Sequence, residues 1–371
     1  MINNKKTNIV ITGANGFIGK NLLLALKENQ YFNVYKIVKN SKIGYVKKVL
    51  KKSEFIFHLA GENRPNNIST FKKNNEEFTK KICDILFKNN IKSTIVFTSS
   101  TQVNLNNSYG QSKRKTEKII LQHKKKNRSK VCILRLTNIF GKLSKPNYNS
   151  FVATICYSVA NNKKYFIEKN ELNLIYIDDL INKFIRLLKF QNIKTYEKVT
   201  PVYKVNTLKV QDLVNRFNLL ENNYFVDDLG HGFVKKLYST FLSFVPKNRW
   251  SHKVKAFEDS RGKFLEFIKT KNSGQISVFS INVGNSRGDH YHHTKTEKFL
   301  IIQGKVKVYF RNIVTNKKHS IYINSNSYKI FNTIPGWAHS IKNIGNNRVI
   351  GIVWANEFFN IKRPDTIRVK I

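Results

Sequence analysis

The fold of the first part of this chain is decided by one stretch, NIVITGANGFIG, which runs from Asn8 to Gly19. Its first five residues are mostly β-branched and predict a strand, and its three glycines predict a tight turn. Leucines then recur at helical spacing. A strand that enters a helix through a glycine turn offers backbone N–H groups at the positive end of the helix dipole, where a pyrophosphate binds. The stretch therefore predicts a dinucleotide site.

Apolar runs separated by helix-length, lysine-rich stretches continue this pattern for most of the 371 residues. The strand-like runs are Val34–Val38, Phe55–Leu59, Thr94–Thr98 and Val131–Leu136, and the amphipathic stretches include Glu76–Phe87 and Ser112–Gln122. Such alternation predicts an α/β Rossmann-type, doubly wound parallel sheet. After Pro246 the pattern changes to short strands punctuated by Gly, Asn and Pro, which predicts an all-β barrel. We therefore expect one domain over residues 1–246 and a second over 247–371.

The end of the second predicted strand indicates which dinucleotide binds. An NAD-selective site places a carboxylate there to hold the ribose 2′-hydroxyl. This chain has Ile37-Val38-Lys39-Asn40-Ser41-Lys42, with lysines and no carboxylate. We expect NADP(H).

A Tyr-x-x-x-Lys pair, Tyr109 and Lys113, follows the sequence Thr98-Ser99-Ser100 at the end of a predicted strand. Four-residue spacing places both side chains on one face of a helix. An ammonium beside a phenol lowers the tyrosine pKa from its usual value of about 10, and a serine hydroxyl can hold a substrate oxygen. Such a group can protonate a carbonyl while a nicotinamide delivers hydride.

The β half carries a histidine-rich constellation: His290 and His292, then Glu297, then His339 after the turn Pro335-Gly336. The two histidines point to one face of a strand, and turns return the other two side chains to the same pocket. Three imidazoles and a carboxylate suit Zn²⁺, Fe²⁺, Mn²⁺ or Ni²⁺. A reaction at such an ion would also need a base. The candidates include His293, Lys295 and Lys298, and the sequence does not rank them.

The motifs TGANGFIG, His58-Leu59-Ala60-Gly61, TSS and YGQSK make the first part resemble the extended short-chain dehydrogenase/reductase family, which acts mainly on nucleotide sugars. The resemblance implies a catalytic group of Ser100, Tyr109 and Lys113, and substrate contacts from Asn138 and Arg64. It also implies a cofactor site that adds Gly13, Asn15, Gly16, Phe17, Ile18, Gly19, Lys39, Leu59 and Ala60 to the tyrosine and the lysine. The 4,6-dehydratases of this family carry an Asp-Glu pair after the serine, whereas this chain has Thr101-Gln102, so reduction or epimerisation is expected.

The histidine constellation resembles both cupin motifs, and the whole chain resembles capsular polysaccharide biosynthesis proteins that join a reductase to a C-terminal cupin. Further stretches that carry this likeness include Lys145-Pro146-Asn147-Tyr148, Trp354-Ala355-Asn356-Glu357 and Pro364-Asp365-Thr366. The resemblance implies a bifunctional homodimer on the path to UDP-N-acetyl-L-fucosamine. Its zinc cupin would epimerise C3 of a UDP-2-acetamido-2,6-dideoxy-4-hexulose. Its reductase would then reduce C4 with NADPH to give UDP-2-acetamido-2,6-dideoxy-L-talose.

Charge and cysteine content bound the remaining possibilities. The formal net charge of +43 is spread over both parts at similar density and accompanies an abundance of Asn, Ile, Phe and Tyr, so we interpret it as compositional bias and expect no nucleic-acid partner. Cys83, Cys132 and Cys156 lie in apolar stretches and predict core residues. We find no membrane-spanning or signal pattern and expect a cytoplasmic protein without membrane insertion.

Two alternative functions remain open at this point. The cupin could be a non-catalytic, metal-stabilised module for dimerisation or ligand sensing beside a simple NADPH-dependent nucleotide-sugar reductase. Alternatively the charge could bind a polyanion, with an affinity that falls steeply with salt.

Overall fold

The computed structural model describes residues 6–63, 67, 69–189, 193–223, 225–226, 228–270, 272–360, 362 and 364–371. Its contacts divide the chain into two compact units. The first contains the N-terminal part up to Asn215 together with Gly232–Pro246, and the second contains Arg216–His231 and Lys247–Ile371. The chain thus passes between the units more than once.

A six-stranded parallel sheet forms the centre of the first unit, in the order β2-β1-β3-β4-β5-β8. Its strands are β1 (Thr7–Thr12), β2 (Phe32–Ile37), β3 (Phe55–His58), β4 (Thr94–Ser100), β5 (Val131–Leu136) and β8 (Tyr196–Glu197). β1 and β3 are apolar and largely buried, as strands covered on both faces must be. Strand order reverses direction at β1, and in such sheets ligands bind at the carboxyl ends of the strands beside the reversal.

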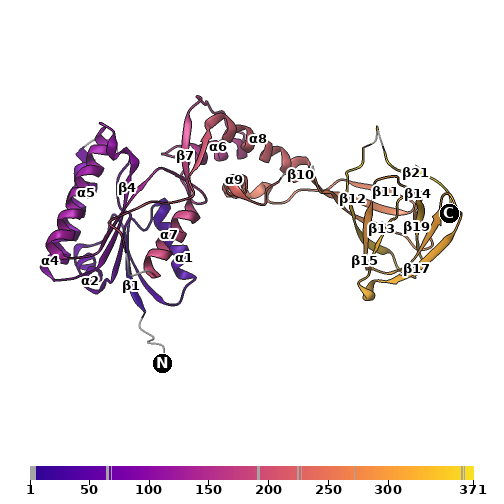
Figure 1. The fold of residues 1–371 in the computed structure, drawn as a ribbon, viewed down its shortest axis with the longest axis horizontal. Coiled ribbons are helices and arrows are strands. Elements are labelled where there is room, and N and C mark those ends of the chain that lie inside the picture. Colours follow the sequence, from indigo (N-terminus) through magenta and orange to yellow (C-terminus); the bar gives the residue numbers. More distant parts are fainter. Residues whose placement is uncertain are drawn as a thin grey trace. The chain divides into compact units, whose positions relative to one another are not determined.

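Helices cover both faces of this sheet (Figure 1). One face packs against α2 (Ile43–Lys52), α4 (Phe78–Lys88) and α5 (Ser108–Asn127), whose apolar side chains join those of β1, β3, β4 and β5 in one core. The other face packs against α1 (Phe17–Lys27) and α7 (Ile177–Lys189). Short α3 (Ser69–Phe71) and the π-helix Lys72–Glu77 precede α4, and the 3₁₀ turn Thr101–Asn104 precedes α5.

A smaller sheet accompanies the large one, in the order β6-β7-β9. Its strands are β6 (Asn138–Phe140), β7 (Glu171–Tyr176) and β9 (Tyr203–Asn206), and the neighbouring helices are α6 (Phe151–Ala160), α8 (Thr207–Asn223) and α9 (Gly232–Leu242). The sequence did not predict this sheet. It carries Asn138 at the start of β6.

The second unit consists of two β-sheets whose inner faces share one apolar core. One sheet has the order β10-β12-β13-β20-β15-β18 with β11 beside β12, and the other has the order β17-β16-β19-β14-β21. The strands are β10 (Phe225–Val226), β11 (Ala256–Asp259), β12 (Gly262–Thr270), β13 (Gly274–Ile281), β14 (Ser286–Tyr291), β15 (Glu297–Gln303), β16 (Lys305–Asn312), β17 (Lys318–Asn324), β18 (Ile330–Asn332), β19 (Trp337–Asn343), β20 (Val349–Ala355) and β21 (Ile367–Arg368). Two 3₁₀ turns, Lys247–Arg249 and Ser325–Ser327, complete the unit. The predicted fold class, a Rossmann-type parallel sheet followed by a cupin-like β-barrel, is confirmed.

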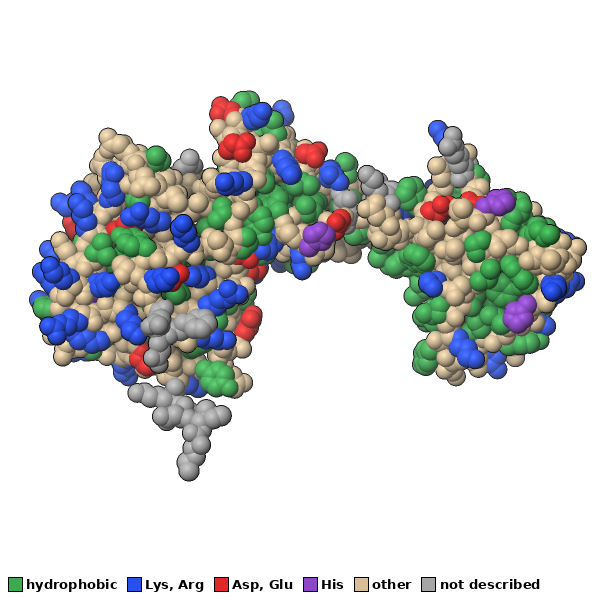
Figure 2. All heavy atoms as spheres, in the orientation of Figure 1, with side chains coloured by type: hydrophobic (Ala, Val, Ile, Leu, Met, Phe, Trp, Pro, Cys, Tyr) green, Lys and Arg blue, Asp and Glu red, His purple; other side chains and the backbone are tan. Residues whose placement is uncertain are grey.

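Basic side chains are scattered over the visible surface of the first unit and do not gather in one stripe (Figure 2). The three cysteines are buried, as predicted. Across the described residues we find no helix with the length and hydropathy needed to cross a membrane.

The aromatic packing of the sheet against α7 gives a stability prediction. Phe57 is fully buried, and its ring centroid lies 4.9 Å from that of Phe184. We expect Phe57→Ala to lower the free energy of unfolding of the first unit by about 3–5 kcal/mol, because it leaves a cavity. Phe166→Ala, at an exposed position, should change it by no more than about 0.5 kcal/mol. Urea unfolding of both variants measures this, and equal effects would contradict the packing.

Candidate functional site

The turn after β1 has no room for a side chain at Gly13 or Gly19. Gly13 has a φ of +67°, and a Cβ there would lie 2.7 Å from the Ala60 backbone nitrogen. A Cβ on Gly19 would lie 2.4 Å from the Gly13 carbonyl oxygen. Helix α1 begins at Phe17 behind Gly16, without a side-chain cap and without an acidic residue in its first turn. Its first N–H groups are therefore suited to an anion.

A buried histidine joins this turn to the neighbouring strand and helix. The Nδ1 atom of His58 lies 2.8 Å from the Thr12 hydroxyl, and its Nε2 atom lies 2.8 Å from the Thr79 hydroxyl. Thr79 donates its own proton to the Asn75 carbonyl, so Nε2–H of His58 must donate to Thr79 and Nδ1 must accept from Thr12. Burial, reinforced by the charge of Lys113, lowers the pKa of His58 to about 3. No role for this neutral imidazole was predicted from the sequence.

The end of β2 presents Lys39 at the same edge of the sheet. Its side chain is exposed, and the turn after the strand closes through a hydrogen bond from Val38 N–H to the Ser41 hydroxyl, 2.9 Å long. The stretch Val38–Lys42 contains no carboxylate.

Ser100, Tyr109 and Lys113 come together where β4 meets α5. The Tyr109 hydroxyl is hydrogen-bonded to Ser100, and the Lys113 ammonium lies 5.9 Å from the centre of the Tyr109 ring. The Asn107 side chain caps α5 by accepting from Gly110 N–H at 2.7 Å, which starts the helix one residue before Tyr109. Tyr109 and Lys113 thus occupy successive turns of one helix face.

Ser99 serves the structure in a different way. Its hydroxyl donates to the buried Glu117 carboxylate at 2.5 Å, and Arg135 holds the same carboxylate with two hydrogen bonds of 3.0 and 2.7 Å. Only Ser100, the next residue, faces the tyrosine.

The protonation of this group differs from the prediction. We expected Lys113 to lower the pKa of Tyr109, but burial raises it, with the Ser100 hydrogen bond opposing and the nearby Tyr148 adding to the rise. The physical reason is that the Lys113 ammonium donates to the Thr98 carbonyl at 3.0 Å instead of approaching the phenol. Burial lowers the pKa of Lys113 itself to about 8, against the opposing charge of Glu117.

A pocket of about 460 Å³ lies in the first unit, and Asn138 and Tyr148 are among its lining residues. The Tyr148 hydroxyl donates to the Glu62 carboxylate at 3.2 Å. The charge of Tyr148 also contributes to the raised pKa of Tyr109. Arg64, which was predicted to contact substrate, lies outside the described residues.

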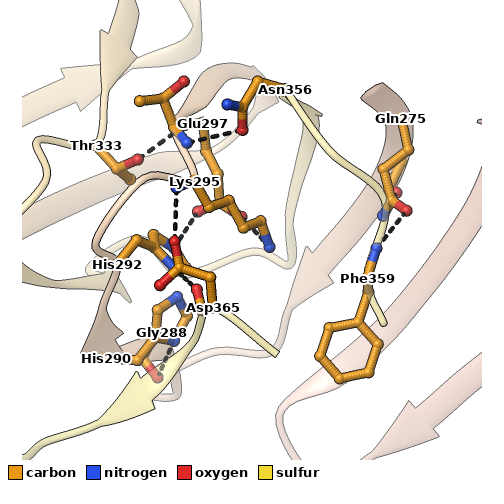
Figure 3. A network of polar contacts seen from close by, with 12 residues as sticks. Gln275, Gly288, His290, His292, Lys295, Glu297, Thr333, Asn356, Phe359 and Asp365 are labelled. Carbon is orange, nitrogen blue, oxygen red and sulfur yellow. Dashed lines mark hydrogen bonds and ion pairs between the residues drawn. The ribbon is translucent and has the colours of Figure 1, made fainter. Parts of the chain in front are cut away.

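His290, His292, Glu297 and His339 gather in the second unit, with one donor atom of each within 4.8 Å of the others. β14 and the residue after it position the first two, the start of β15 carries the glutamate, and β19 carries the last. Glu297 Oε2 lies 3.3 Å from His292 Nε2 and 3.5 Å from His339 Nε2. Figure 3 shows His290, His292 and Glu297 with the polar groups around them.

The hydrogen bonds of this cluster leave nitrogen lone pairs pointing inward. His290 Nδ1 donates to the Gly288 carbonyl and His292 Nδ1 donates to the Asp365 carbonyl, so both Nε2 atoms are unprotonated in the neutral rings. The Nε2 atom of His290 is buried and has no hydrogen-bond partner among the described residues. Burial and the neighbouring His339 lower the pKa of His290 to about 3. An unpaired buried acceptor of this kind fits a divalent cation.

Glu297 is held in its charged form. Burial raises its pKa, but the contacts with the imidazoles of His292 and His339 and the charge of Lys295 together keep that pKa well below its usual range. Lys295 is itself buried, with its ammonium 3.2 Å from Glu297 Oε1. Deprotonated imidazoles and a carboxylate are the forms that bind metal.

The structure separates the three lysine and histidine candidates around the cluster. His293 and Lys298 are exposed, and the Lys298 ammonium donates to the Asn332 side chain at 2.9 Å. Of the three, Lys295 alone reaches a ligand of the cluster.

Each of the two units matches a known protein family. Residues 9–200 match the NAD dependent epimerase/dehydratase family, and residues 257–367 match the polysaccharide biosynthesis C-terminal domain. The chain is 38% identical over 362 residues to a UDP-2-acetamido-2,6-beta-L-arabino-hexul-4-ose reductase of Pseudomonas aeruginosa, covering 96% of this chain and 97% of that protein.

Comparisons with solved structures agree with these sequence matches. The capsular polysaccharide assembling protein CapF from Staphylococcus aureus superimposes with a TM-score of 0.93 at 35% identity, covering 98% of this chain and all of that one. UDP-N-acetylglucosamine 4-epimerase from Bacillus cereus, at 18% identity and a TM-score of 0.55, covers 67% of this chain and 99% of its own and shares the fold.

The buried ammonium of Lys113 predicts a pH dependence. Its pKa is about 8 in the folded chain against 10.5 for an ordinary lysine, so between these values the unfolded chain binds more protons. The free energy of unfolding of the wild type, measured relative to that of Lys113→Met, should therefore rise as the pH increases from about 8 to 10.5. Urea unfolding of both proteins across this window measures the difference. Lys118→Met, at an exposed position of the same helix, should show no such trend, and a flat difference for Lys113→Met would contradict the assignment.

Proposed function

Because this chain belongs to the NAD dependent epimerase/dehydratase family and resembles CapF along its whole length, we propose that it epimerises and then reduces a UDP-linked 4-keto sugar. The proposed substrate is UDP-2-acetamido-2,6-dideoxy-4-hexulose, and the proposed product is UDP-2-acetamido-2,6-dideoxy-L-talose, for capsular polysaccharide. The observation that carries the proposal is the presence in one chain of a Ser100–Tyr109–Lys113 group and a buried three-histidine, one-glutamate cluster.

Reduction takes place at the Tyr109 group. A bound nicotinamide supplies the hydride. Tyr109 donates its phenolic proton to the C4 oxygen, and the Ser100 hydroxyl holds that oxygen in place. Because burial raises the Tyr109 pKa, the phenol is protonated at neutral pH, as an acid for reduction must be. Lys113 fixes the end of β4 through Thr98 and places positive charge beside the cofactor.

The cofactor we propose is NADPH. The glycine turn and the N-terminus of α1 provide backbone N–H groups for the pyrophosphate. Exposed Lys39 after β2 offers a positive charge to a ribose 2′-phosphate, and the stretch around it lacks the carboxylate that would favour NAD.

The cupin cluster would hold a divalent metal through His290, His292, Glu297 and His339, and zinc fits this donor set. Such an ion supplies positive charge that increases the acidity of the C3 proton next to the C4 ketone. The buried Lys295 ammonium adds positive charge at the same place. Epimerisation is reversible, and reduction of the ketone then fixes the new configuration.

The homodimer and the cytoplasmic location stay predictions from the sequence. Dehydration is disfavoured because Thr101 and Gln102, which follow Ser100 in the 3₁₀ turn, carry no carboxyl group.

Removal of one oxygen atom tests the reductase assignment. We expect Tyr109→Phe to lower the rate of NADPH oxidation with the UDP-ketosugar by about 10²–10⁴-fold, because the proton donor is lost. Tyr31→Phe, at an exposed position of the same unit, should keep the wild-type rate. The absorbance of NADPH gives both rates. If Tyr109→Phe reduced the sugar at the wild-type rate, another group would have to supply the proton.

A further inference from the structure

The C-terminal segment pairs with the strand that carries the first histidine of the cluster. His290 is in register with Arg368, and Tyr291 is in register with Ile367, in the antiparallel pair β14–β21. The pairing continues with a hydrogen bond of 2.9 Å from Val369 N–H to the Asp289 carbonyl. Residues near the end of the chain are therefore part of the wall of the cluster.

Asp365, just before β21, contacts the cluster with its backbone. Its carbonyl oxygen accepts the proton on His292 Nδ1 at 2.5 Å, across 73 residues of sequence. A carbonyl is an acceptor only, so this bond places the proton on Nδ1 and leaves Nε2 free to bind a cation. It also fixes the orientation of the ring.

The carboxylate of the same residue anchors the turn that leads from His292 to Glu297. Its oxygens accept from the backbone N–H groups of His293, Thr294 and Lys295 at 2.9, 2.7 and 2.8 Å, and from the Thr294 hydroxyl at 3.1 Å. Figure 3 shows Asp365 with Lys295. One side chain thus satisfies three successive backbone donors. With this turn fixed, Lys295 and Glu297 follow at set positions.

We propose that Asp365 is a positioning residue of the metal centre, which it builds from the far end of the chain. It is not a ligand: it orients His292 through its carbonyl and sets the 293–295 turn through its carboxylate. Loss of the carboxylate should weaken metal binding although all four ligands remain. This inference rests on the metal site proposed above.

Asp365→Asn tests the role of the carboxylate most directly. Whichever way its amide is turned, an NH₂ group faces at least one of the backbone N–H donors that the carboxylate accepted. We expect a chelator to remove Co²⁺ from this variant of the full-length protein about tenfold faster or more than from wild type, with an altered Co²⁺ absorption spectrum. Thr294→Val, which removes a single donor, should change the rate in the same direction by less. Glu258→Gln, an exposed carboxylate-to-amide change on β11, should match wild type.

The possible outcomes distinguish the positioning role of Asp365 from the existence of the metal site. Wild-type release rate and spectrum in Asp365→Asn would overturn the positioning role, and a lowered melting temperature alone would show a merely structural one. If Asp365→Asn did not fold, an unchanged rate and spectrum in Thr294→Val would overturn it equally. Failure of the wild-type protein to take up either Co²⁺ or Zn²⁺ would overturn the metal site itself, and the inference with it.

Discussion

Parallel pairing of β1, β3 and β4 is the constraint on which the first unit depends. Because parallel strands end at the same edge of a sheet, the glycine turn after β1, the Leu59–Ala60 segment after β3 and Ser100 at the end of β4 all lie at that edge. The close approach of Gly13 to Ala60 excludes any larger residue at position 13. His58 then links this edge to α4 through a hydrogen bond with Thr79.

Burial shifts pKa values in both units, but it favours different chemistry in each. In the first it keeps the Tyr109 phenol protonated and weakens the hold of Lys113 on its proton, which suits donation of a proton to a carbonyl. In the second it keeps the His290 imidazole neutral, while the contacts with His292 and His339 and the charge of Lys295 keep Glu297 ionised. The second site is therefore suited to binding a cation, and the first is suited to donating a proton. Perturbed pKa values of this kind are typical of functional sites.

Much of this arrangement could be predicted from local patterns. The strands at 55–58 and 131–136 follow from apolar runs, the glycine turn from its spacing, and the four-residue cluster from the histidine motifs. The patterns were insufficient where long-range contacts decide. Helix α5 starts at Ser108 and not near Ser112 because Asn107 caps it, and the three-residue strand β6 is too short for any periodicity.

Burial and distant partners were the other limits. No pattern showed that the Lys113 ammonium turns toward Thr98, so the direction of the Tyr109 pKa shift was wrong. Asp365 stood in a stretch noted for its resemblance alone, 73 residues from His292. Only the pairing of β21 with β14 brings the two together.

The mass of the product shows whether the two units act in turn on one substrate, as we propose. UDP-2-acetamido-2,6-dideoxy-4-hexulose and NADPH would be incubated with the enzyme in D₂O, and the product returned to H₂O before mass spectrometry. We expect a product heavier than the substrate by the two hydrogens of reduction, with one further carbon-bound deuterium in place of hydrogen at C3. A reduced product without carbon-bound deuterium would contradict the proposal, because the cupin would then have no part in the chemistry.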